Sequence, residues 1–174
     1  MKLRVPHIIA PAASFLRSKT AGVCLILICS ALLVEGKDSM RWLGGFQVIS
    51  LQDIQTRTQV STGSSSITLL TTGNAEISAD NTDAARLTEP GGGGLYTEYM
   101  LEFDGDGASS TGGTTVDFTS YDSFLTSPAQ VTHVLGDDRV TVTLSVRASN
   151  YANQLANAGT YSATQTLTAS WVGP

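Results

Sequence analysis

The residues of this sequence that could support catalysis are few, and histidine is the first to consider. Hydrolysis by a nucleophilic side chain needs a base and a group that orients the base. His133 is the only histidine after His7, and it lies in a stretch with strand character. No Ser-His-Asp or Cys-His motif accompanies it. We therefore interpret His133 as a structural or surface residue of a strand.

The stretch DGDG contains two alternating carboxylates, Asp104 and Asp106, which could offer oxygen ligands to calcium. An EF-hand loop would need an acidic or amide residue at position 108 and a glutamate at position 115. The chain has Ala108 and Thr115 there instead. We interpret the stretch as a simple turn.

Two further motifs have the composition of a site but not its spacing. Glu98 and Glu102 share one face of a predicted strand about 13 Å apart, which is too far for a retaining glycosidase pair and long for an inverting one. The glycines at 91–94 lack the Lys-Ser/Thr of a phosphate-binding loop and do not begin a helix. We predict that the protein is not an enzyme and has no catalytic site, cofactor or metal.

The N-terminal region has the organisation of a secretion signal. Basic residues between Lys2 and Lys19 precede an uncharged apolar stretch at 21–34, AGVCLILICSALLV. This stretch is shorter than the roughly 20 residues of a membrane span. We predict a signal peptide at 1–36, with cleavage between 36 and 45 and no stable membrane insertion afterwards. A single N-terminal membrane anchor is the alternative.

Removing residues 1–36 changes the chemistry of the chain. Cys24 and Cys29 are its only cysteines, so the remaining domain has no disulfide and depends on packing and strand pairing. Six Lys and Arg then face fourteen Asp and Glu, for a net charge of −8. Such an acidic surface disfavours nucleic acid and anionic lipid as partners. The length predicts one domain.

The rest of the chain is rich in Thr, Ser and Gly and shows period-two alternation of apolar and polar residues, which is typical of half-buried strands. We expect strands at 67–72, 74–80, 96–104, 114–120, 129–135 and 139–148, with a tight turn at 135–138 and room for one helical turn within 149–159. One apolar face on each strand predicts two antiparallel sheets packed as a sandwich.

A long strand ends the sequence. From Tyr161 to Trp171 the odd positions carry the larger or apolar side chains, while Ser and Thr occupy every even position. Only three residues follow Trp171. The edge of this strand therefore needs a partner from elsewhere.

The terminal stretch NAGTYSATQTLTASW resembles the end of bacterial chaperone/usher pilins, of the archaic or alternative branch that includes spore-coat-U-like domains. The resemblance implies an immunoglobulin-like sandwich that lacks one strand and leaves a groove beside the last strand. A neighbour's N-terminal extension fills that groove, which is called donor-strand complementation. The resemblance assigns the groove to the terminal strand, at Tyr161, Leu167, Ala169 and Trp171.

The donor strand expected from this resemblance lies in RWLGGFQVISL, where an extended chain places Trp42, Gly44, Phe46 and Val48 on one face. The predicted organisation is a signal at 1–36, an N-terminal extension or donor strand at 37–51, and a sandwich at 52–174. The alternative is that residues 46–51 form the first internal strand of the domain.

The function expected from the resemblance is that of a secreted structural subunit of a cell-surface fibre, a pilus or fimbria. Its partners would be other copies of the chain, a periplasmic chaperone and an outer-membrane usher. The main alternative is a secreted surface-binding sandwich, such as an adhesin or a carbohydrate-binding module. The aromatic residues, 7% of the chain, fall mostly at predicted core positions, which disfavours that alternative. A secreted hydrolase would need the bases that the sequence lacks.

Overall fold

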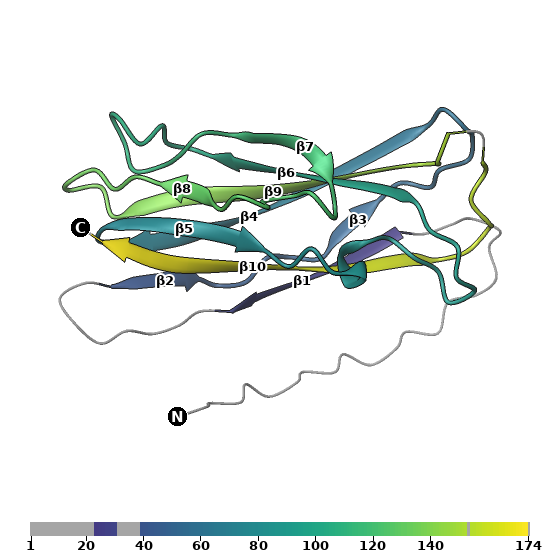
Figure 1. Cartoon of the computed structure of the whole chain (residues 1–174), viewed down its shortest axis with the longest axis horizontal. Coiled ribbons are helices and arrows are strands. Elements are labelled where there is room, and N and C mark those ends of the chain that lie inside the picture. Colours follow the sequence, from purple (N-terminus) through teal and green to yellow (C-terminus); the bar gives the residue numbers. More distant parts are fainter. Residues whose placement is uncertain (1–22, 31–38, 153, 174) are drawn as a thin grey trace, which may run out of the picture.

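The protein is an all-β sandwich of two five-stranded sheets, as the alternation of the sequence predicts. The computed structural model describes residues 23–30, 39–152 and 154–173. Figure 1 shows the two layers lying along the long axis, with the C-terminus at one end. Within these ranges every strand pair is antiparallel except one, the pair that joins the first and last described strands.

The strands of sheet A follow the order β3-β1-β10-β5-β8, and those of sheet B the order β2-β4-β9-β6-β7. Sheet A consists of β3 (Ile49–Leu51), β1 (Val23–Ser30), β10 (Tyr161–Gly173), β5 (Asn74–Ala79) and β8 (Ala129–Val131). Sheet B consists of β2 (Met40–Leu43), β4 (Val60–Thr71), β9 (Arg139–Ser149), β6 (Tyr96–Phe103) and β7 (Val116–Ser120). Each layer has a long strand at its centre.

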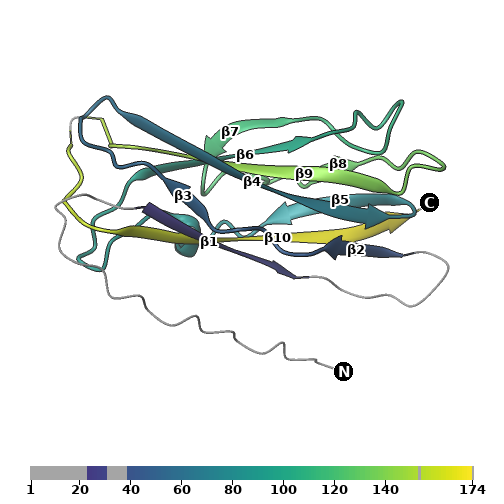
Figure 2. The same cartoon turned by 180° about the vertical axis from the view of Figure 1, so that it is seen from behind.

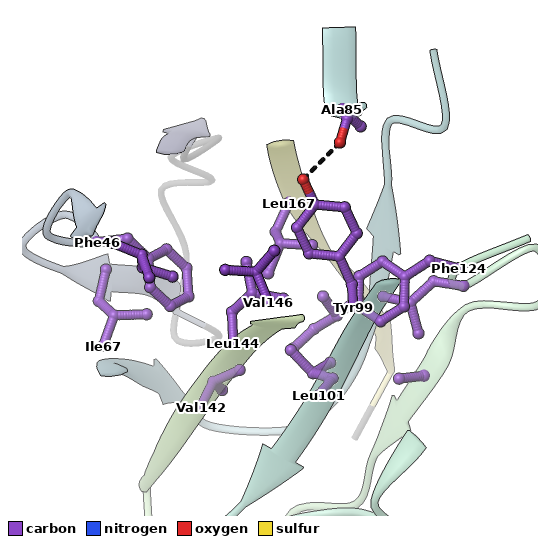
Figure 3. Close-up of a cluster of buried hydrophobic side chains, with 14 of the residues drawn as sticks. Phe46, Ile67, Ala85, Tyr99, Leu101, Phe124, Val142, Leu144, Val146 and Leu167 are labelled. Atoms are coloured by element: carbon purple, nitrogen blue, oxygen red, sulfur yellow. Dashed lines mark hydrogen bonds between the residues drawn. The ribbon is translucent and has the colours of Figure 1, made fainter. Parts of the chain in front are cut away.

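The core lies between the sheets and is built from the apolar face of each strand. In β9 the alternate residues from Val140 to Ala148 are buried, and β10 contributes Leu167 from the facing sheet. Tyr99 and Phe124 are fully buried with their ring centroids 5.5 Å apart. Figure 3 shows these side chains meeting in one cluster, with the Tyr99 hydroxyl donating a hydrogen bond to the Ala85 carbonyl at 2.6 Å. Burial raises the pKa of Tyr99 well above its usual range.

Two local predictions need correction. Strand β4 begins at Val60 and pairs with β9 from there, seven residues before the expected start at 67. The Ser and Gly residues of that stretch do not show the alternation of apolar and polar residues that predicts a strand. The described part of 149–159 contains no helix, only a hydrogen bond from the Gln154 amide to the Tyr151 carbonyl. The one helical element among the described residues is the 3-10 turn η1 (Asp83–Ala85). No helix in this part of the chain is long and apolar enough to cross a membrane.

Candidate functional site

The terminal strand β10 is the central strand of sheet A, and its two faces differ as the sequence predicts. Tyr161, Leu167 and Ala169 are buried, whereas Ser162 and Ser170 are exposed. Trp171, expected on the core face, is only partly buried. Its ring lies over Gly73, where an added Cβ would come within 2.3 Å of the Trp171 Cη2 atom.

The two flanks of β10 are covered by different parts of the chain. On one flank, β5 pairs antiparallel with the C-terminal half, from Leu167 onward. On the other flank, β1 pairs parallel with the N-terminal half, in the register Val23↔Tyr161 to Ser30↔Thr168. Figures 1 and 2 show β1 beside β10 from both sides of the molecule. The strand β1 belongs to the apolar stretch that we predict to be the core of the signal peptide.

The backbone of β10 shows which hydrogen-bonding groups β1 covers. The amide of Ser162 donates to the Thr88 carbonyl, and the Thr166 carbonyl accepts from the Asp80 amide, so both residues direct their backbone groups toward the β5 side. Because successive residues of a strand point their backbone groups to opposite sides, Ala163 and Gln165 direct theirs toward β1. An unpaired flank would leave these groups for another strand.

Strand β3 completes this arrangement on the far side of β1. It pairs antiparallel with β1 in the register Leu25↔Ile49 and Cys24↔Ser50, and β1 is its only strand partner among the described residues. Its position against sheet B depends on Gly63, where a Cβ would come within 2.7 Å of the Ile49 Cγ2 atom. Without β1, the gap between β3 and β10 has room for one strand.

Gln165 is a polar residue on the inward face of β10 that the sequence analysis did not single out. Its side chain is fully buried and its Oε1 atom has no hydrogen-bond partner. Its Nε2 atom donates only a long bond, 3.5 Å, to the neighbouring Thr166 carbonyl. It occupies the register position opposite Leu27 of β1. The strand alternation placed Gln165 among the inward residues, and that was the signal available in the sequence.

In the single chain, Trp42, Gly44, Phe46 and Val48 do not form one extended arm, and their role as a donor strand stays a prediction. Trp42 lies in β2, paired with β4 of its own domain, and Trp42 and Phe46 are both buried. The positive φ of Gly44, +104°, interrupts the extended chain, so Phe46 folds back to within 6.1 Å of Trp42 while Val48 is 54% exposed. The internal-strand alternative corresponds to β3, which begins at Ile49.

The residues considered for chemistry have structural partners. The His133 Nε2 atom lies 3.0 Å from Asp138 Oδ1 beside the turn at 135–138, where Gly136 has a φ of +86°. Asp106 accepts backbone hydrogen bonds from Ser109, Ala108 and Ser110, and these bonds lower the pKa of its carboxyl. The DGDG stretch is thus a turn closed by its own aspartate.

Glu98, one of the two carboxylates expected on one strand face, pairs with an arginine. Glu98 accepts a 2.8 Å bond from Arg147 Nε, and the Arg147 guanidinium lies 4.2 Å from the centre of the Phe118 ring. This hydrogen bond raises the pKa of Arg147. Glu98 is therefore one half of an ion pair on the outer face of sheet B. Within the described residues no cluster of three His, Cys, Asp or Glu side chains could hold a metal ion.

The predicted signal peptide overlaps both described and undescribed parts of the chain. Residues 1–22 and 31–36 lie outside the described residues, as do 37 and 38 of the predicted cleavage interval. The described part, β1, is a strand of sheet A. No protein-family model matches the chain, and no curated protein matches its sequence.

Proposed function

We propose that the chain is a secreted structural subunit of a cell-surface fibre, in which subunits polymerise by donor-strand complementation. The partner is a second copy of the chain, delivered by a periplasmic chaperone and an outer-membrane usher. Main-chain hydrogen bonds along the accepting strand supply affinity, and alternate side chains supply register. A head-to-tail contact of this kind does not close on itself, so it propagates.

The observation that carries the proposal is the covering of β10 by β1. Eight residues of the central strand, Tyr161 to Thr168, pair on one flank with a segment that has the features of a removable signal. Removing that segment uncovers backbone groups of Ala163 and Gln165 and the inward side of the strand. A sheet edge of this length in the middle of a sandwich requires another strand.

The place of cleavage decides what the mature domain retains. A cut ahead of Lys37 removes all of β1 and keeps β2, whereas a cut after Arg41 also divides β2 and uncovers β4. The first cut therefore leaves sheet B complete and opens only the site between β3 and β10. We infer cleavage ahead of Lys37.

The donated strand is then the segment that contains β3, at 46–51. Loss of β1 removes the one strand that pairs with β3 among the described residues, and the exposed Gly44 and Gly45 precede β3 as a hinge. The apolar Ile49 and Leu51 can fill the groove of a neighbouring copy as they fill the core of their own domain. This donor overlaps the segment expected from sequence but excludes Trp42, which stays with β4.

Disulfide trapping tests the contact, because residues 37–174 contain no native cysteine. Ser50 and Ser162 are both exposed and both register with position 24 of β1, so they lie two strand spacings, about 10 Å, apart in one chain. A disulfide needs Cα atoms closer than about 7 Å. Ser50→Cys combined with Ser162→Cys, and separately with Thr164→Cys, should therefore link neighbouring subunits of the secreted protein into a ladder on non-reducing gels.

The same gels include a control pair of cysteines and show the results that would contradict the proposal. Leu135→Cys with Ser162→Cys places one cysteine in the turn between β8 and β9 and should give no ladder. Fibres without engineered cysteines should run as a ladder in SDS that collapses on boiling. A sharp monomer band before heating contradicts polymerisation. A disulfide within one chain would mean that β3 closes its own flank, which favours the surface-binding alternative.

A further inference from the structure

A cleft lies at the end of the sandwich opposite the C-terminus. Figure 1 shows the loop between β9 and β10 at that end, beside the loop that precedes β6. The cleft has a volume of about 310 Å³ and is lined by Gly93, Gly94, Tyr151, Gln154, Leu155, Ala156 and Asn157. Ligand sites in proteins begin at about this volume.

The glycine run at 91–94 packs around a carboxylate and a guanidinium. A Cβ on Gly93 would come within 2.7 Å of Glu89 Oε1, and one on Gly159 within 2.4 Å of Glu89 Oε2. A Cβ on Gly94 would meet the Arg86 guanidinium at 2.4 Å. Gly93 and Gly94 therefore form a wall of the cleft that is closely packed against Glu89 and Arg86.

The opposite wall is held in place by hydrogen bonds that surround the cleft. Asn150 accepts a bond from the Ala156 amide and donates one to the Thr56 carbonyl, each within 2.9 Å. Asn157 donates to Glu89 at 2.9 Å, and its carbonyl accepts a bond from the Tyr161 hydroxyl at 2.8 Å. Both ends of the loop are thus tied to the sandwich, so a ligand would meet a largely formed site.

Aromatic and aliphatic groups lie beside amides in this cleft. The Tyr151 ring lies 5.3 Å from the Arg86 guanidinium and 5.9 Å from the Tyr96 ring, which it meets edge-on. Leu155 is 53% exposed, and Gln154 is exposed with no side-chain partner among the described residues. Amides both donate to and accept from hydroxyl groups, while aromatic and aliphatic surfaces accept the C–H faces of a sugar ring.

From this juxtaposition we propose that the cleft binds a neutral saccharide. Gln154 and Asn157 hydrogen-bond ligand hydroxyls, and Tyr151 and Leu155 contact the apolar face of the ring. An anionic ligand fits less well, because the Glu89 carboxylate lies in the same wall as Arg86 and the domain after residue 36 has a net charge of −8. None of the residues that line the cleft pairs with β1, so the proposal does not rest on strand exchange.

The test measures binding of named sugars to the purified protein by saturation-transfer NMR. The probes are methyl mannoside, methyl galactoside and N-acetylglucosamine, with N-acetylneuraminic acid and inorganic phosphate as anionic probes. At least one neutral sugar should bind at millimolar concentration. Leu155→Asp and Gln154→Ala, both at exposed positions, should weaken that binding at least tenfold without changing the fold.

Matched variants at the other end of the molecule serve as controls. Leu135 is 96% exposed in the turn between β8 and β9, and Gln130 is exposed on β8. Leu135→Asp and Gln130→Ala should leave sugar binding unchanged. The proposal is overturned if no neutral sugar binds, if an anionic probe binds more tightly, or if the cleft variants bind as well as the controls.

Discussion

The two sheets of the sandwich are completed in different ways. Sheet B takes all its strands from residues 40–149, and every pair in it is antiparallel. Sheet A includes β1, whose parallel pairing with β10 comes from the stretch with signal-peptide character. Under the proposed function, sheet B therefore keeps all its strands when β1 is removed, whereas sheet A has a strand position that must be filled again.

This difference assigns the stability of the domain mainly to sheet B and its assembly with other copies to sheet A. The central pair β4 and β9 of sheet B is aligned over eleven residue pairs, from Val60↔Ser149 to Leu70↔Arg139. In sheet A, β5 pairs with β10 only from Leu167 onward, so the N-terminal half of β10 has β1 as its strand partner and is held on the other flank by the bridge between Thr88 and Ser162. Under the proposed function, sheet B holds the fold while sheet A exchanges partners.

The largest expected effect comes from deleting residues 1–36, which removes β1 and leaves sheet B intact. The free energy of unfolding of the monomer should fall on the order of 5 kcal/mol, since several backbone hydrogen bonds at about 1 kcal/mol each and the cover of the core are lost. Urea unfolding of residues 37–174, compared with the full chain, measures the loss.

A peptide supplies the control for this deletion. Adding residues 21–32 as a separate peptide should restore stability in proportion to its concentration, whereas a scrambled peptide should not. If residues 37–174 alone unfold at the same urea concentration as the full chain, β1 contributes nothing and the contrast between the sheets disappears.

A second test concerns the core that the two sheets share. Phe124 is fully buried against Tyr99, whereas Phe118 lies beneath Arg147 on the outer face of sheet B. Phe124→Ala should lower the free energy of unfolding by about 4 kcal/mol through lost burial and a cavity, and Phe118→Ala by about 1 kcal/mol. Equal losses in urea unfolding would mean that the inner face is not the main source of stability.

The sequence predicted those parts of the molecule that alternation governs. The strands at 74–79, 96–103, 139–149 and 161–173 follow period-two patterns and lie close to their expected positions. The inward positions Tyr161, Leu167 and Ala169 of the terminal strand are buried as expected. These features depend on local physics, because one buried face and one exposed face leave a direct mark on residue order.

The pairing of segments that lie far apart in the sequence cannot be predicted from residue order in this way. The pairing of 23–30 with 161–168 joins segments more than 130 residues apart, and an apolar stretch with signal-peptide features is equally compatible with a buried strand. The positive φ of Gly44 turned Val48 away from the face it was expected to share with Phe46. The contacts of Gly93 with Glu89 and of Gly94 with Arg86 depend on how the loops fold, and the run of glycines at 91–94 does not indicate them.

A third test concerns Gln165 on the inward face of β10 and asks whether its buried amide lacks a hydrogen-bond partner in the folded protein. Gln165 is fully buried and its Oε1 atom lacks a partner, which costs about 1–2 kcal/mol of desolvation. Gln165→Leu, a change to an apolar side chain of similar size, should therefore raise the free energy of unfolding by about 1 kcal/mol. Gln130→Leu, at an exposed residue that bonds Glu76, should give no gain. A loss of stability at Gln165→Leu would show that the amide is satisfied in the folded protein.

The smallest expected effect lies on the outer face of sheet B, where a single ion pair can be removed without touching the core. Glu98→Gln keeps an acceptor for Arg147 but removes the charge, and because the guanidinium is partly exposed the loss should stay below about 1 kcal/mol. Glu102→Gln removes the same charge from the same face of β6, where no ion partner is present among the described residues, and so corrects for the change in net charge. The difference between these two variants in thermal unfolding should shrink in 1 M salt, because salt screens exposed charges over about 3 Å. A difference that exceeds 2 kcal/mol, or that persists in salt, would mean that sheet B depends on this pair as sheet A depends on β1.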